Sequence, residues 1–213
     1  SVVYGGNDGD RFLIVARHSG GLGLFDMATA DAEVTGYGMI DGGGAAEIFL
    51  DNAPATLLIG DATDALRDAL DAGALALSAE AVGAMDVAKD MMLDYLRTRT
   101  QFGTPIGKFQ VLQHRSVEMV SQIEQARSIL ILAASKLGAE DQSRHVSMCK
   151  SLIGRAAKLV AEETIQMQGG IAMTWEYPSS HYAKRITMID HQPPDGSPRA
   201  RPAPGAAPLP SSL

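Results

Sequence analysis

Residues 166–178 read QMQGGIAMTWEYP, and this stretch decides how the C-terminal part of the chain is organised. An apolar-periodic segment stops there at Gly169 and Gly170, and a Trp-Glu-Tyr-Pro turn follows at once. Glycine adopts backbone angles that a Cβ forbids, and it leaves no side chain between the main chain and an approaching molecule. The pair therefore predicts either the end of a helix or a place where a cofactor lies against the main chain.

Helical periodicity surrounds this break. Apolar residues recur at helical spacing over residues 66–97, over a second segment that carries Val117 and Ile123 on its apolar side, and over about residues 141–168. We expect Thr104 and Pro105 to be the N-cap and first residue of the second helix. A shorter helix is expected from Pro178 to about residue 189. Long helices with short connections predict an antiparallel, mostly four-helix bundle over residues 61–192.

The first 60 residues show a different pattern. Short apolar or alternating runs, separated by glycine-rich turns, are typical of strands. The runs are residues 11–17, 23–26, 34–39 and 46–50. Their spacing predicts an antiparallel sheet or part of a β-barrel. The expected fold class is therefore α+β: a partial antiparallel β-domain over residues 1–60, followed by the helical bundle.

The two ends of the sequence look unlike natural domain boundaries. The N-terminus, SVVYGGNDGD, reads like the middle of a sheet, so we expect that the chain is truncated there. Residues 193–213 hold seven of the ten prolines and lack a periodic apolar pattern. We expect this tail to be disordered, and we hypothesise that it arises from a reading-frame change or a cloning junction.

Composition excludes several classes of function. A net charge of −7 argues against a nucleic-acid partner, because phosphate binding needs a basic surface. Apolar runs are too short for a membrane span, and the N-terminus is not a signal peptide. Cys149 is the only cysteine, which fits a reducing compartment, and we expect a cytoplasmic location. The five histidines show no ligand spacing, so no metal site is expected.

A second motif, residues 95–110, reads YLRTRTQFGTPIGKFQ. Together with residues 166–189, QMQGGIAMTWEYPSSHYAKRITMI, it resembles the C-terminal part of the acyl-CoA dehydrogenases. The resemblance implies that residues 1–60 are late strands of that family's middle β-domain and that residues 61–192 are its C-terminal bundle. It also implies FAD at a subunit interface, where one subunit holds the flavin ring and the partner's bundle reaches the diphosphate and adenosine.

The resemblance assigns cofactor contacts to both motifs. Arg99 would offer a guanidinium fork to the diphosphate, and the glycine pair would let the cofactor approach the main chain. Taken singly, Arg99 would most often be a solvated helix-end charge, and the glycine pair would be a helix C-cap. Their joint occurrence favours the cofactor. The residues implied are Arg99, Gln101, Phe102, Gln110, Gln166, Gly169 and Gly170.

A catalytic base is missing from both positions that the family uses. The base removes the proton α to the thioester carbonyl and is a glutamate in the family. The position that follows the short helix is Pro193 here, and the alternative position on the first long helix is about Gly73. Asp71 and Asp190 lie near these positions without matching them. We therefore expect no catalytic residue in this chain, which resembles the base-less subunit of mixed oligomers.

The leading interpretation is an acyl-CoA dehydrogenase-like flavoprotein subunit that lacks the base. Its implied partners are an acyl-CoA substrate, an electron-transfer flavoprotein, and further subunits in a homo- or hetero-oligomer, dimer or tetramer, that share FAD. Two alternatives stay open: a non-catalytic helical assembly module without a cofactor, and a flavin-dependent monooxygenase or oxidase of the same superfold.

Overall fold

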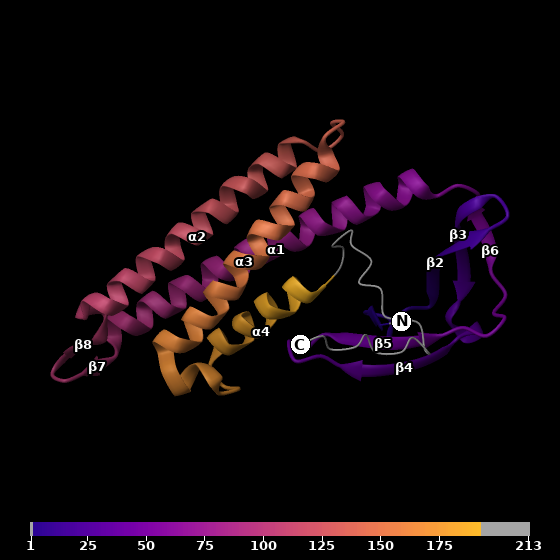
Figure 1. Ribbon diagram of the computed structural model, residues 1–213. Helices are drawn as coiled ribbons and strands as arrows, with labels where there is room; N and C mark the ends of the chain where they lie inside the picture. The colour runs from indigo at the N-terminus through magenta and orange to yellow at the C-terminus, as the bar shows by residue number, and fades with distance from the viewer. Residues whose placement is uncertain (1, 193–213) are drawn as a thin grey trace, which may run out of the picture.

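The computed structural model describes residues 2–192, so the expectations for Pro193 and for the tail lie outside the described residues. The C-terminal two thirds form a bundle of four helices: α1 (Thr63–Thr98), α2 (Gln110–Ser135), α3 (Gln142–Gln168) and α4 (Pro178–His191). Figure 1 shows α2 and α3 beside the C-terminal half of α1, with the short α4 next to them. The first turns of α1 run on past the bundle towards the strands.

The bundle owes its stability to a continuous core of small and flexible apolar side chains. Met85 and Met92 of α1, Ile123 of α2 and Ile186 of α4 are fully buried. Alanines on α1 and α3 let the helices approach closely, and methionine fills the irregular gaps between them. Val117 departs from the sequence expectation, because it is 68% exposed while Met119 takes the core position.

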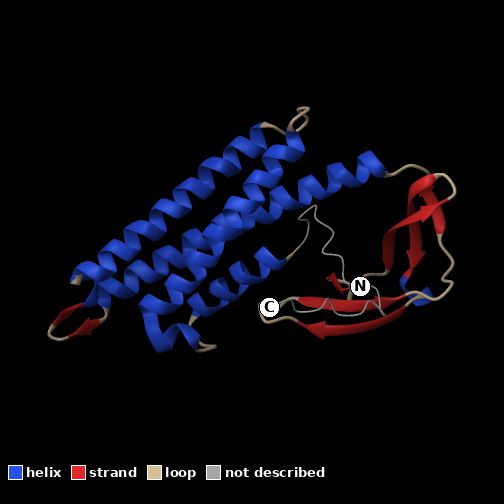
Figure 2. Ribbon diagram, viewed as in Figure 1, coloured by secondary structure: helices blue, strands red, loops and turns tan. Residues whose placement is uncertain are grey.

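The strands make small antiparallel sheets, drawn red in Figure 2. One sheet has the order β1-β5-β4 and a second has the order β2-β3-β6. Their bounds are β1 (Val2–Tyr4), β2 (Arg11–His18), β3 (Gly21–Ala28), β4 (Glu33–Gly38), β5 (Gly44–Phe49) and β6 (Thr56–Ile59). The expected fold class, α+β with antiparallel strands before a helical bundle, is confirmed.

The start of the second helix differs from the prediction. Thr104 and Pro105 are not an N-cap and a first helical residue: they form strand β8 (Thr104–Pro105), which pairs with β7 (Thr100–Gln101). A short 3-10 turn follows, and α2 begins only at Gln110. The physical reason is the two-residue turn at Phe102 and Gly103, whose φ angles are 53° and 77° and which sends the chain back along itself.

Two links tie the strands to the bundle. The backbone N–H of Ala62, just before α1, donates to the carbonyl of Leu22 in β3 at 2.7 Å. On the other side, Arg185 of α4 reaches Asp41 in the turn between β4 and β5 at 2.8 Å. Within residues 2–192, the helices are all too short or too polar to cross a membrane.

Candidate functional site

Antiparallel packing gathers the two sequence motifs at one end of the bundle, which we call the motif end (residues 99–110 and 166–178). Arg115 near the start of α2 makes a two-pronged ion pair with Glu163 near the end of α3, at 2.7 and 2.8 Å. Tyr95 in the last turns of α1 lies edge-on to Tyr177, with ring centroids 6.4 Å apart. The C-termini of α1 and α3 and the N-termini of α2 and α4 therefore share this end, as Figure 1 also shows.

A tight hairpin presents the first motif. Phe102 and Gly103 both have positive φ, which is the geometry of a two-residue hairpin turn that continues the twist of its strands. Phe102 is 92% exposed, and its ring makes an edge-to-face contact with Phe109 at a centroid distance of 6.1 Å. The hairpin thus projects an aromatic ring into solvent.

Arg99, Gln101 and Gln110 are all exposed around this hairpin. The backbone N–H of Arg99 closes the last turn of α1 by donating to the Tyr95 carbonyl at 2.8 Å. Its guanidinium has no ion-pair partner among the described residues. Gln101 donates only to the neighbouring Thr100 carbonyl, at 2.9 Å. Their hydrogen-bonding groups are thus available to a ligand.

The second motif is a helix end followed by an open turn. Gly169 has φ 69° and ψ −149°, and its N–H donates to the Ile165 carbonyl, so it is the C-cap of α3. The chain then makes the 3-10 turn η3 (Gly169–Met173) before α4. A Cβ built on Gly170 would meet nothing within 4 Å, so packing inside this chain does not demand glycine there. Close approach of an outside group would explain it.

Sequence reasoning did not identify Gln168, a buried glutamine that joins the end of α3 to the start of α4. Gln166 is exposed, as a ligand contact would require, whereas Gln168 is buried. The Gln168 Oε1 accepts a hydrogen bond from the Ser179 hydroxyl in the first turn of α4, at 2.8 Å. The signal in the sequence was the i, i+2 spacing of the two glutamines, which puts them on different faces of α3.

A second feature, which we call the clasp, consists of Arg185 on α4, Glu80 on α1 and Asp41 in the turn between β4 and β5. The guanidinium holds both carboxylate oxygens of Glu80 on α1, at 2.6 and 2.8 Å, and one oxygen of Asp41 at 2.8 Å. The Asp41 side chain is only 4% exposed. Burial opposes its ionisation, but hydrogen bonds from Arg185 and the Gly43 amide outweigh burial and hold the pKa of Asp41 below its ordinary value.

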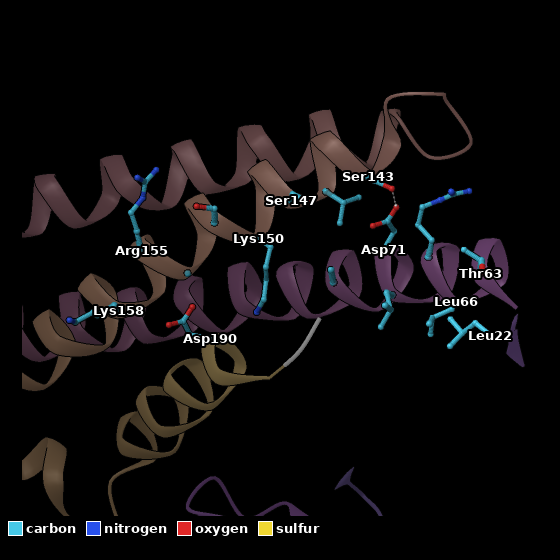
Figure 3. Close-up of a pocket in the computed structure, with 16 residues that line it drawn as sticks. Leu22, Thr63, Leu66, Asp71, Ser143, Ser147, Lys150, Arg155, Lys158 and Asp190 are labelled. Atoms are coloured by element: carbon cyan, nitrogen blue, oxygen red, sulfur yellow. Dashed lines mark hydrogen bonds between the residues drawn. The ribbon is translucent and has the colours of Figure 1, made fainter. Parts of the chain in front are cut away.

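A cavity with a volume of about 910 Å³ lies between α1 and α3 (Figure 3). Leu66, Leu70 and Val146 provide apolar wall, and Asp190 of α4 and Leu22 of β3 also line the cavity. The buried Lys150 on α3 donates to the Ile189 carbonyl at 2.8 Å, which fastens the C-terminal turn of α4. No sequence motif had pointed to this cavity.

Two carboxylates near this cavity, Asp71 and Asp190, either accept hydrogen bonds from neighbouring side chains or are exposed to solvent. Asp71 accepts hydrogen bonds from Ser143 at 2.6 Å and from Gln142 at 3.1 Å, and Figure 3 shows its pair with Ser143. Asp190 is exposed at the end of α4. In residues 2–192, the carboxylates whose pKa is shifted all have it lowered, opposite to the change that suits a general base. The described residues also contain no group of His, Cys, Asp or Glu suited to a metal ion.

Comparison with known proteins gives a family match over the helical part. The model of the family "Acyl-CoA dehydrogenase, C-terminal domain" matches residues 63–190, more than half of the chain. The acyl-CoA dehydrogenase IpdE2 of Mycolicibacterium smegmatis is 34% identical over 115 residues, which are 54% of this chain and 36% of that protein. The chain thus spans about a third of the length of this relative.

Solved structures share the fold over a longer range. One chain of the ChsE4-ChsE5 complex from Mycobacterium tuberculosis superposes with a TM-score of 0.83 and 22% identity, over 90% of this chain and 54% of that one. A protein described as an FAD-dependent dehydrogenase gives a TM-score of 0.80 and 23% identity, over 89% of this chain and 55% of that one. At these identities the likeness is one of fold.

Proposed function

This chain belongs to the acyl-CoA dehydrogenase family, and we propose that it is a flavoprotein subunit whose motif end binds the diphosphate and adenosine end of FAD while the catalytic base comes from elsewhere. The chain covers about half of the solved structures it resembles, so its activity is a proposal about the assembled protein.

The observation that carries the proposal is the combination of exposure and chemistry at the motif end. All seven residues implied by the sequence, Arg99, Gln101, Phe102, Gln110, Gln166, Gly169 and Gly170, are exposed there. An arginine without an ion-pair partner in the described chain suits a diphosphate, because its fork matches phosphate oxygens. Amide side chains and an open glycine backbone supply further hydrogen bonds. Pure bundle packing would not need this set.

Residues 2–192 offer groups that can bind and orient a ligand, but none of them is placed as a catalytic base. When bound, FAD supplies the acceptor for the hydride that leaves the β-carbon of an acyl-CoA. The α-proton must go to a carboxylate, and Gly73 on α1 has none. Asp71 is already hydrogen-bonded to Ser143 and Gln142. We therefore propose that another subunit supplies the base in a mixed oligomer.

The assembly follows from the same proposal. FAD shared between subunits requires a dimer or tetramer, homo- or heteromeric, and the structural neighbour named above is a complex of two differently named chains. We propose acyl-CoA as the substrate, an electron-transfer flavoprotein as the electron acceptor and a cytoplasmic location for the assembly.

Binding of ADP and FAD to the full chain tests the proposal. We expect Arg99→Met to weaken both by roughly 10- to 100-fold, since a charge-assisted hydrogen bond contributes about 1.5–3 kcal/mol. Arg97→Met is the matched control, because Arg97 is exposed on the same turn and, within residues 2–192, its ion pair is with Asp94, at 3.1 Å. Calorimetric titration gives both affinities. Absence of binding, or an equal loss in the control, would favour the non-catalytic assembly module.

A second experiment separates the flavin chemistries. Anaerobic mixing of the flavin-loaded assembly with an acyl-CoA should bleach the flavin absorbance if the protein is a dehydrogenase. A flavin that stays oxidised until a different substrate and oxygen are added would favour the monooxygenase or oxidase alternative.

A further inference from the structure

Trp175, the only tryptophan of the chain, stands in the turn between η3 and α4 and is 63% exposed. Two side chains of α4 hold it. The ring of His181 lies edge-on to the indole, with centroids 4.8 Å apart at 87°, and its Nε2 is 2.8 Å from the Trp175 carbonyl. The Lys184 ammonium lies 4.3 Å from the centre of the indole ring. An exposed aromatic side chain is thus fixed from two directions.

The two holding residues are placed by helix geometry. His181 and Lys184 are three positions apart, so they lie on one face of α4. Side chains on a helix lean towards its N-terminus, which directs both back over the turn that precedes α4. Because a carbonyl can only accept, the hydrogen bond to Trp175 requires the proton of His181 to be on Nε2.

The rest of the turn has few anchors. Ala172 is buried, but Ile171 and Met173 are 41% and 75% exposed. Thr174 folds back onto the Ile171 carbonyl through its hydroxyl and its N–H, at 2.9 and 3.1 Å, which is a local contact. Two glycines begin the turn, and glycine has the largest conformational freedom to lose. Without the contacts to Trp175, the downstream half of the turn would be held mainly at Tyr177 and Pro178.

We propose that His181 and Lys184 are positioning residues: they lock Trp175, and through it they keep the turn that starts at Gly169 and Gly170 in one conformation that accepts the ligand. The ligand class, an adenine nucleotide diphosphate, rests on the proposed function. The lock itself rests only on the contacts around Trp175.

The single tryptophan makes the lock measurable by nuclear magnetic resonance. In the ¹⁵N-labelled full chain, we expect one sharp indole N–H resonance. The order parameter of the indole N–H should be similar to the order parameters of the surrounding backbone N–H groups. His181→Phe keeps an aromatic edge but removes the donor, and Lys184→Met removes the cation. Both should broaden or split the resonance, while His181→Gln and Lys184→Arg should restore it, since they return a donor and a cation. An indole resonance unchanged in His181→Phe and in Lys184→Met would overturn the lock.

Binding of ADP tests whether the lock serves the ligand. Lys184→Met should weaken ADP roughly two- to fivefold, the range of an exposed cation–π contact, with helical circular dichroism and Tm unchanged. Lys184→Arg should retain the affinity. A changed indole resonance with unchanged ADP affinity would overturn the positioning role. A wild-type chain that leaves ADP unbound would overturn the proposed function, while the indole resonance would still decide the lock by itself.

Discussion

The helical bundle and the strand region bury their side chains to very different extents. In the bundle, large residues such as Met85, Met92 and Ile123 have no exposed surface. In the strand region, Leu13 is 68% exposed and Phe49 is 64% exposed. The bundle thus has a core of its own, whereas much of the apolar surface of the sheets faces outward.

The stability of the chain therefore resides mainly in the bundle. Burial of apolar surface is the main favourable term in folding, so α1 to α4 should fold as the stable unit. The strand region has few large buried side chains, chiefly Phe12 and Met27, and depends on its links to the bundle. Exposed apolar patches of this kind mark surfaces that a larger assembly can cover.

The strongest destabilisation is expected from a substitution in the bundle core. Ile123→Ala should lower the free energy of unfolding by about 2–5 kcal/mol, because it leaves a cavity among packed helices. Val117→Ala on the same helix should cost under about 0.5 kcal/mol, since Val117 is exposed. Urea titration followed by helical circular dichroism measures both. Equal losses would show that the exposed face of α2 is covered in solution.

The clasp should have an intermediate and local effect. Arg185→Met leaves the buried Asp41 carboxylate without its partner and should cost about 2 kcal/mol, felt mainly by β4 and β5. Hydrogen exchange of residues 33–49 should accelerate, while exchange in α2 stays unchanged. As a control, Lys158→Met removes an exposed cation 4.0 Å from Glu162 and should leave both regions unchanged. Acceleration throughout the bundle would contradict the division into two regions.

Acid should weaken the same contact. The folded pKa of Asp41 lies below that of an unfolded aspartate, about 3.9, so its contribution is complete above that value. The contribution is lost as the pH falls through the lower, folded pKa. Protection of residues 33–49, corrected for intrinsic exchange, should therefore hold down to about pH 4 and decline below it. In Asp41→Asn this decline should disappear, and its persistence would assign it to another carboxylate.

The smallest effect is expected on the outer face of the sheets. Leu13→Thr replaces an exposed apolar side chain with a β-branched polar one and should change the free energy of unfolding by less than about 0.5 kcal/mol. Chemical denaturation of the full chain measures it. A loss above about 1 kcal/mol would mean that something already covers this face in the isolated chain.

The sequence predicted the long elements well because apolar residues recur on the face of each helix or strand that packs against its neighbours. The helix expected over about residues 141–168 is α3 (Gln142–Gln168), and the strand expected over residues 11–17 is β2 (Arg11–His18). The hairpin of β7 and β8 was missed because Thr104 and Pro105 are also good helix-start residues. Only the turn at Phe102 and Gly103 decides between the two structures, and a phenylalanine with positive φ is rare.

The candidate site was predictable in part. Both motifs were visible as sequence, and the antiparallel bundle that was predicted is the packing that brings them to one end. The clasp was not visible, because Asp41, Glu80 and Arg185 are far apart in the chain and each is an ordinary charged residue. The cavity between α1 and α3 is likewise lined by residues that are far apart in the chain, from α1, α3, α4 and β3, and no local pattern encodes their meeting.

The positive φ angle of Phe102 has a consequence that a mutant library can measure. A bulky residue in the left-handed region carries a penalty on the order of 1 kcal/mol that glycine would avoid, and here it has no core to fill. In a library randomised at this position, a screen for thermal tolerance of the lone chain should enrich glycine or asparagine. A screen for function in the assembled protein should instead enrich phenylalanine. Comparison of the residues enriched in the two screens would separate the requirement of the hairpin's own conformation from the requirement of its contacts with other subunits.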